Sequence, residues 1–237
     1  MRTIKKVASH IFIDGFGGMT QGLFATLIIG TMIQQIGLLI GGSTGNVIYL
    51  LGKAAAALTS AGIGVGVAVK YGESPLVTVS AAVAAMVGGY AGKITGGTFF
   101  VDGNAVLAGP GEPLGAFIAA FASITCGHLV SGKTKVDIIV TPVITIGAGS
   151  VVGLLVGPPI SHMMTGLGSI INWATEQRPF IMGIVVSVVM GMVLTLPISS
   201  AALGIILNLS GLAAGAATIA ETAINYRHSA LSVHESP

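Results

Sequence analysis

The residues with the clearest chemical potential surround one carboxylate, in the run Gly109-Pro110-Gly111-Glu112-Pro113. Alternating glycine and proline prevent a regular helix there. At membrane depth, irregular backbone is tolerated only where it is buried in protein or lines a watery cavity, and a carboxylate is costly. We therefore predict a substrate-binding site at Gly111, Glu112 and Pro113, in which Glu112 accepts hydrogen bonds from solute hydroxyls or binds a coupling proton. The alternative is an ordinary external loop.

Two further polar residues stand beside predicted helix interruptions. His162 follows Gly157-Pro158-Pro159, where a histidine could face a cavity or donate a hydrogen bond to a freed carbonyl. Ser199 follows Pro197, where its hydroxyl could contact a sugar or cap the backbone. We include His162 and Ser199 in the expected substrate-binding set, with both alternatives open for each.

Residues 127–134 match the phosphate-binding pattern GxxxxGK[ST]. That loop needs a strand before it and a soluble α/β domain around it, whereas this one joins two apolar stretches. We interpret it as a cytoplasmic connection.

Other kinds of chemistry find no support in the sequence. No Ser-His-Asp order, paired carboxylates or metal-spaced cluster emerges, and Cys126 is the single cysteine. The net charge of +2 is too small for a nucleic-acid footprint. We expect no catalysis by this chain alone, no cofactor, no metal and no nucleic-acid partner.

The elements that must position these residues are membrane helices. Charged residues are 8% of the 237 and hydrophobic residues 53%, and the mean hydropathy is +0.93. Because so few charged residues cannot cover the surface of a soluble protein, the lipid bilayer is the expected solvent. A membrane helix needs about 20 apolar residues. Dividing the charge-free stretches at Gly, Asn and Pro clusters predicts about eight spans, near residues 17–40, 47–69, 75–92, 107–130, 138–157, 160–175, 180–196 and 201–220.

The predicted fold class is therefore all-α, a polytopic transmembrane helical bundle. Re-entrant half-helices near residues 107–115 or 157–175 are the alternative to complete spans there. Residues 1–220 form the membrane domain and residues 221–237 a polar C-terminal tail.

Basic residues indicate the orientation of the spans. With a cytoplasmic N-terminus, Lys93 lies outside and Lys53 within a span, and both termini are cytoplasmic. The remaining eight of the ten basic residues then lie inside, at Arg2, Lys5, Lys6, Lys70, Lys133, Lys135, Arg178 and Arg227.

Many of the 36 glycines recur at four-residue spacing. Small residues on one helix face let backbones approach closely in lipid. We favour packing within the chain over a dedicated dimerisation face. Examples are Gly62 and Gly66, then Gly88 and Gly92, then Gly149, Gly153 and Gly157.

Three runs together carry a family resemblance. They are Pro-Gly-Glu-Pro-Leu-Gly-Ala-Phe at 110–117, Gly-Lys-Thr-Lys-Val-Asp-Ile-Ile-Val-Thr-Pro at 132–142, and the segments at 190–202 and 209–217. With them the chain resembles the phosphotransferase-system EIIC membrane family, which also contains perfringolysin-regulator-like proteins. The resemblance covers roughly residues 1–220.

The resemblance implies a multi-pass permease component of the bacterial inner membrane, which moves a sugar-like solute while partner proteins phosphorylate it. In better-understood sugar EIIC proteins a Glu-Pro motif at a helix break contacts the sugar, and by similarity that role is carried onto Glu112 only. The phosphocysteine of such systems lies in a separate EIIB unit, so Cys126 is not a candidate. The expected partners are the solute, an EIIB-type phosphocarrier subunit, the lipid bilayer and a second copy of the chain in a homodimer.

The C-terminus departs from the family pattern. Similar proteins continue through further spans, whereas polar sequence begins at Glu221 and the chain ends at Pro237. We therefore expect a shortened C-terminus. The second hypothesis for function is a non-transporting membrane regulator or sensor derived from such a permease.

Overall fold

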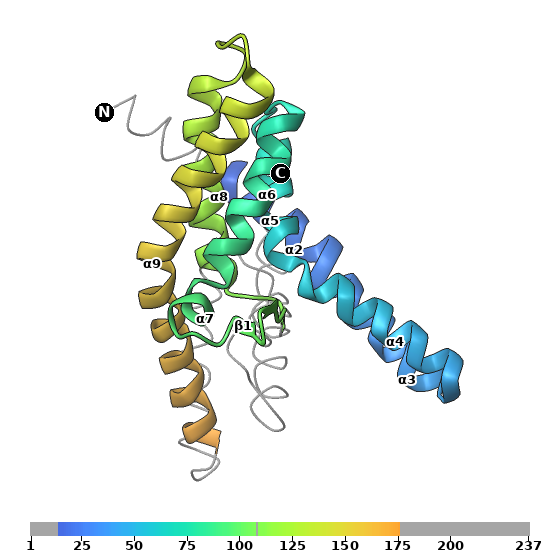
Figure 1. The fold of residues 1–237 in the computed structure, drawn as a ribbon. Coiled ribbons are helices and arrows are strands. Elements are labelled where there is room, and N and C mark those ends of the chain that lie inside the picture. The colour runs from blue at the N-terminus through green and yellow to red at the C-terminus, as the bar shows by residue number, and fades with distance from the viewer. Residues whose placement is uncertain (1–13, 108, 176–237) are drawn as a thin grey trace, which may run out of the picture. The chain divides into compact units, whose positions relative to one another are not determined.

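The computed structural model describes residues 14–107 and 109–175, which form helices and one short strand pair (Figure 1). The chain divides into two units, Met1–His162 and Met163–Pro237. The first unit contains every element described below except the end of helix α9, which continues into the second. Of the second unit, the described residues are the last turns of the final helix.

Helices account for nearly all of the described chain. The first is continuous and consists of α2 (Phe16–Leu23), a π-helical turn η2 (Phe24–Ile28) and α3 (Ile29–Ile40). The later elements are α4 (Gly42–Ala57), α5 (Thr59–Lys70), α6 (Pro75–Gly89), α7 (Ala91–Thr95), the strands β1 (Phe100–Val101) and β2 (Asn104–Ala105), α8 (Pro113–Val130) and α9 (Asp137–Thr175).

Several of these helices are long and apolar enough to cross a membrane. In the described residues they are Phe16–Ile40, Pro113–Val130 and Asp137–Gly166, and the pair α4 and α5 counts as a fourth if it is one broken span. The predicted all-α membrane fold is confirmed. The spans predicted at 180–196 and 201–220, and the tail at 221–237, lie outside the described residues.

One predicted helix interruption is wrong. Helix α9 continues through Pro158 and Pro159, so residues 138–157 and 160–175 do not form two helices, nor is 157–175 a separate half-helix. A proline inside a helix removes one hydrogen bond, whereas ending the helix leaves up to four N–H and four C=O groups without partners. Lipid supplies no water to replace those partners, so the continuous helix is favoured.

A different interruption was not predicted. Residues 47–69, expected as one span, form α4 and α5, which bend by 53° at Leu58. The carbonyls that this bend frees find hydroxyl partners. Ala56 O accepts from Thr59 Oγ1 at 2.6 Å, and Ala57 O lies 3.1 Å from Tyr90 Oη. The tyrosine is 33 positions away in sequence, so local patterning could not reveal the bend.

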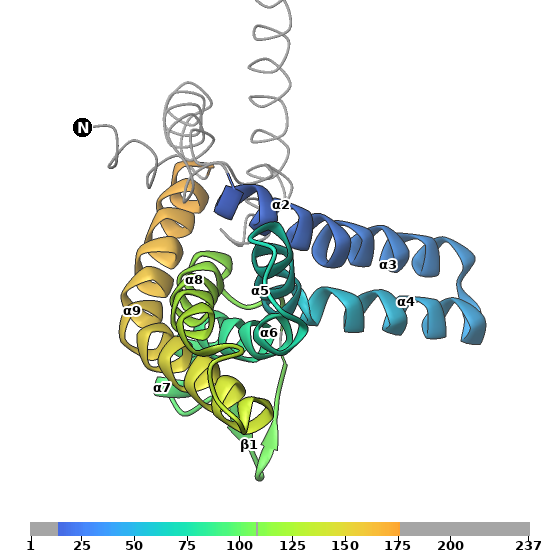
Figure 2. The ribbon, with the colours of Figure 1, turned by 90° about the horizontal axis from the view of Figure 1, so that it is seen from above.

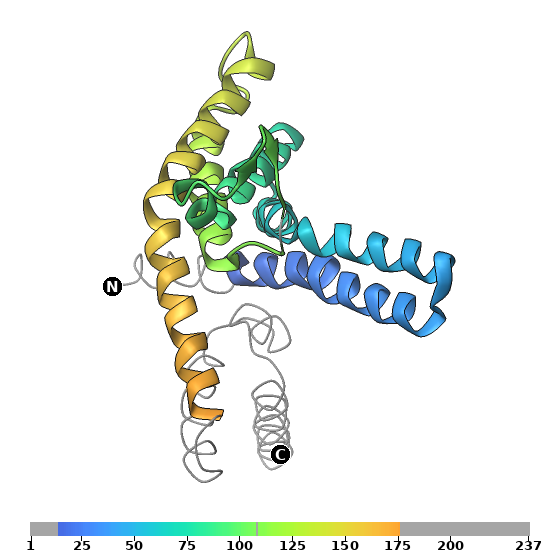
Figure 3. The same cartoon turned by 60° about the horizontal axis from the view of Figure 1, so that its bottom comes forward.

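Helices α3 and α4 form a hairpin. They turn at Gly41 and Gly42, whose φ angles of 66° and 63° favour glycine. Figures 2 and 3 show the two helices side by side, extending away from α5, α6 and α8. Many apolar side chains of the hairpin are exposed, including Leu38, Leu39 and Leu51, as suits a surface in contact with lipid.

Helices α5, α6, α8 and the first part of α9 pack side by side (Figures 1 and 2). Glycines set their separation. A methyl group on Gly88 would lie 2.5 Å from Gly115 O of α8, and one on Gly153 would lie 2.8 Å from the Gly88 Cα atom. The predicted role of four-spaced glycines in close packing within the chain is therefore confirmed at these positions.

The strands β1 and β2 pair antiparallel between α7 and α8. Asp102 and Gly103 have φ angles of 51° and 78°, which is typical of a two-residue type I′ turn. The Asp-Gly pair between Phe100-Val101 and Asn104-Ala105 is a sequence signal for such a hairpin, which was not among the predicted elements.

Candidate functional site

The segment before α8 is irregular, as the run of glycine and proline predicts. Gly109 and Gly111 have φ angles of 82° and 76°, which other residues rarely adopt. Glu112 then takes an extended conformation as the N-cap of α8, and Pro113 is the first helical residue. The Glu112 carboxylate accepts a hydrogen bond from Leu114 N at 3.5 Å.

This irregular segment is held against α5 and α6 through its backbone. Glu112 N donates to Gly89 O at 2.6 Å, and Ser60 Oγ donates to Pro110 O at 3.0 Å. Tyr90 Oη also lies within hydrogen-bond distance of Gly109 O. Residues 109–112 are therefore positioned by groups from two other helices, which is unlike an ordinary external loop.

The close approach of residues 109–112 to helices α5 and α6 depends on small residues. A methyl group on Gly111 would lie 2.5 Å from Ser60 Oγ, and one on Gly89 would overlap the same hydroxyl. Both glycines thus leave room for the Ser60 side chain, which in turn holds Pro110.

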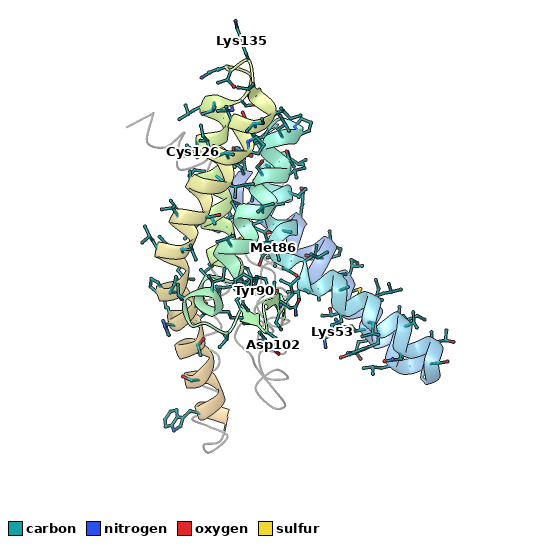
Figure 4. All side chains as sticks on the ribbon, viewed as in Figure 1. Lys53, Met86, Tyr90, Asp102, Cys126 and Lys135 are labelled. Carbon is teal, nitrogen blue, oxygen red and sulfur yellow. The ribbon has the colours of Figure 1, made fainter. Side chains whose placement is uncertain are left out.

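Three helix interruptions meet at this place. They are the bend at Leu58 between α4 and α5, the break at Tyr90 between α6 and α7, and the unwound segment that ends at Glu112. Figure 4 shows Tyr90 and Asp102 toward one end of the bundle, with Lys135 at the other. Tyr90 is 1% exposed and connects all three interruptions.

Burial controls the protonation of the site. It raises the pKa of the Glu112 carboxyl to about 7, although the Leu114 N–H opposes this shift. Burial also raises the pKa of Tyr90 to about 12, so its hydroxyl stays a donor. Lys93 Nζ lies 5.3 Å from the centre of the Tyr90 ring, and partial burial lowers the pKa of Lys93.

The arrangement suits binding through hydrogen bonds. Near neutral pH the Glu112 carboxyl can exist as acid or carboxylate, so it can donate to or accept from a hydroxylated solute. Among residues 14–107 and 109–175, no group of three or more His, Cys, Asp or Glu residues could hold a metal ion.

The predicted site residues have different outcomes. Gly111, Glu112 and Pro113 lie together at the start of α8. His162 lies exposed on α9, and no hydrogen bond within the described segments joins it to Glu112. Ser199 lies outside the described residues.

The GxxxxGK[ST] match at residues 127–134 also lacks the structural setting of a phosphate-binding loop. Residues 131–136 follow helix α8 and not a strand. Within this loop Gly132 N already donates to Asp137 Oδ1 at 2.9 Å, so the backbone group is occupied by a carboxylate of the chain itself.

Sequence reasoning missed Ser60 and Tyr90. A tyrosine inside the small-residue run Gly88-Gly89-Tyr90-Ala91-Gly92 is a signal that could have marked the break between α6 and α7. Ser60 gives no such signal, because its partner at Pro110 is 50 positions away.

Comparison with known families gives one match. A family model described as "Phosphotransferase system, EIIC" matches residues 13–235, which is nearly the whole chain. No curated protein and no solved structure matches the chain.

Proposed function

The chain belongs to the phosphotransferase system EIIC family, and from its place as a membrane component of such a transport system we propose that it moves a sugar-like solute bound at Glu112. Phosphorylation of the solute is carried out by an EIIB-type partner, which brings its own phosphorylated residue. The chain itself binds and releases the solute.

The observation that carries this proposal is a partly buried carboxyl group at the meeting point of three helix interruptions. Its backbone N–H bonds to Gly89 O, and the segment before it bonds to Ser60. Burying a carboxylate within the protein is costly, so its retention favours a function over a packing role. The fixed backbone would orient the carboxylate before the solute arrives, which reduces the entropy that binding costs.

The ionised carboxylate is the form that we assign to solute binding. A carboxylate accepts hydrogen bonds from sugar hydroxyls, and such charge-assisted bonds are stronger than neutral ones. Gly111 and Pro113 shape the backbone beside it. We keep His162 and Ser199 as proposed contacts that only a solute-bound structure can test.

Location and assembly complete the proposal. We place the chain in the bacterial inner membrane with both termini on the cytoplasmic side, because this orientation puts eight of ten basic residues inside. The protein works as a homodimer alongside its EIIB-type partner.

A binding experiment tests the site. The full chain in lipid nanodiscs is titrated with a panel of sugars and sugar alcohols, and binding is measured by calorimetry. For the solute that binds, Glu112→Gln weakens binding roughly tenfold to a hundredfold, because a hydrogen bond to a charged group contributes about 1.5–3 kcal/mol. Asp102→Asn, on the exposed hairpin turn, is the matched control and leaves binding unchanged.

Two results would count against the proposal. If no solute in the panel binds the wild-type chain, the transport function loses its support. If Glu112→Gln binds as tightly as the wild type, the solute site lies elsewhere.

A further inference from the structure

A groove of about 290 Å³ lies beside the second half of α8, away from Glu112. Its walls come from the loop between α5 and α6 and from one face of α8. They consist of Tyr71, Glu73, Phe121, Ile124, Thr125, His128 and Leu129. Neither the proposed solute site nor any contact described above accounts for it.

One end of the groove is polar. His128 Nδ1 lies 3.0 Å from Glu73 Oε1, and the Glu73 side chain is only 9% exposed while that of His128 is 74% exposed. Beside this pair, the Ser74 and Ser131 hydroxyls are 3.0 Å apart and join the same two segments. A largely buried acid with an exposed histidine therefore forms one end of the groove.

The other end is apolar. The Phe121 ring packs 6.2 Å from the Tyr71 ring and 6.4 Å from the Phe117 ring, measured between centres. Phe121 and His128 are seven residues apart on α8, which corresponds to a rise of about 10 Å. The groove thus changes from apolar to polar along the helix axis.

The change from an apolar to a polar lining along α8 agrees with the change from lipid to water at the surface of a bilayer. Helix α8 is long and apolar enough to cross a membrane, and it ends at Val130. The loop that follows carries the exposed Lys133 and Lys135. The polar end of the groove is therefore at the level where lipid head groups meet water, and the apolar end lies deeper along the helix.

We propose that this groove binds one phospholipid with a primary-amine head group. Its ammonium group donates to the Glu73 carboxylate, and its phosphate accepts a hydrogen bond from His128. An acyl chain lies along Phe121, Ile124 and Leu129. Charge complementarity selects the amine, because a carboxylate accepts several hydrogen bonds, so Glu73, whose Oε1 atom lies beside His128, can also accept one from an ammonium group.

A comparison of head groups on the wild-type chain tests the proposal without any substitution. The purified full-length protein is titrated with dioleoyl phosphatidylethanolamine or dioleoyl phosphatidylcholine, and bound lipid is counted by native mass spectrometry. The two lipids share their acyl chains, but only the primary amine has N–H donors. We expect the ethanolamine lipid to bind at least tenfold more tightly.

Two variants locate the binding to the groove. Glu73→Gln abolishes the preference between the two lipids, whereas Asp102→Asn, at an exposed acid outside the groove, preserves it. Thr125→Trp fills the groove and removes the bound lipid, whereas Thr44→Trp, at an exposed threonine of α4, does not. Circular dichroism checks that each variant is folded, and the wild-type comparison stands if one is not.

Three outcomes would overturn the proposal. The first is equal binding of the two lipids to the wild type, and the second is unchanged preference in folded Glu73→Gln. The third is that glycerophosphoethanolamine, which lacks acyl chains, competes as well as the intact lipid does. That last result would make the groove a site for a soluble amine.

Discussion

At the scale of single residues, Tyr90 and Glu112 determine the candidate site. Tyr90 is buried at the break between α6 and α7, and its hydroxyl lies near the carbonyls of Ala57 and Gly109. It therefore holds the irregular segment before α8 in place. Glu112 contributes the chemistry, and its protonation depends on the burial that this arrangement creates.

Tyr90→Phe tests the positioning role. The variant keeps the ring but leaves the Gly109 and Ala57 carbonyls without their hydroxyl partner, which should cost about 1–3 kcal/mol of stability. Solute affinity should fall as well, because residues 109–112 are less firmly held. Thermal unfolding and solute titration in nanodiscs measure the two effects. Tyr49→Phe, on α4 and away from this site, is the control and should change neither.

The raised pKa of Glu112 predicts a pH dependence of stability. Its pKa of about 7 in the folded protein exceeds the ordinary value of 4.5, so the folded state binds the proton more tightly. The stability that this provides is complete below pH 4.5 and is lost as the pH rises through 7. The shift corresponds to at most about 3 kcal/mol.

Glu112→Gln should remove this dependence, because the amide is neutral at every pH and can still accept the Leu114 N–H. We expect the variant to gain stability relative to the wild type between pH 5 and pH 8, as measured by thermal unfolding. A constant difference between the two proteins across this range would show that burial does not raise the pKa of Glu112.

At the scale of elements, the site depends on interruptions that support one another. Helix α6 has 15 residues, which rise about 22 Å, less than the roughly 30 Å core of a bilayer. After the break at Tyr90, α7 continues the chain. The Leu58 bend and the unwound segment before α8 meet the same break. There the Ser60 hydroxyl of α5 donates to Pro110 O and lies where a methyl group on Gly89 of α6 would overlap it.

A double-mutant cycle tests that contact. Gly89→Ala should destabilise the protein, because the added methyl group overlaps Ser60 Oγ. Ser60→Gly removes the overlapping atoms and should relieve part of that loss, so the double variant is more stable than the two single effects predict. Thermal unfolding measures the stability of the wild type, of each single variant and of the double variant.

Gly147→Ala is the control for this cycle. This α9 glycine has nothing within 4 Å of an added methyl group, so the substitution should be neutral or slightly stabilising. Additive effects of Gly89→Ala and Ser60→Gly would contradict direct contact between the two positions.

At the scale of the whole membrane bundle in the first unit, charge separates its two ends. Lys70 is the last residue of α5, and the loop after α8 carries Lys133 and Lys135, whereas Lys93 follows the break at Tyr90. Figure 4 shows Lys135 and Asp102 at opposite ends. If the end with more lysines is cytoplasmic, the strand pair and the start of α8 lie toward the outside.

Cysteine labelling tests this orientation. With Cys126 replaced by alanine, Asp102→Cys should react with a membrane-impermeant maleimide added to intact cells, whereas Lys135→Cys should react only after permeabilisation. Cells expressing the cysteine-free chain provide the background. The reverse pattern would mean that the orientation is inverted.

Much of the fold was accessible from the sequence. Low charge and long apolar stretches required membrane helices, because a soluble surface cannot be built from so few polar groups. Gly111 and Pro113 required irregular backbone around Glu112, because one lacks a side chain and the other lacks an N–H group. Four-spaced glycines indicated close helix packing. These are local or compositional properties, so they need no knowledge of tertiary contacts.

Only the tertiary structure decided how the interruptions combine. Pro158 and Pro159 remain inside α9, while the helix bends at Leu58, which has neither glycine nor proline beside it. Whether a helix breaks depends on whether its freed carbonyls find new partners, and at Leu58 one partner is the distant Tyr90 hydroxyl. The sequence by itself determined that Glu112 stands in irregular backbone. Its burial against α5 and α6 follows from hydrogen bonds to residues far away in the chain.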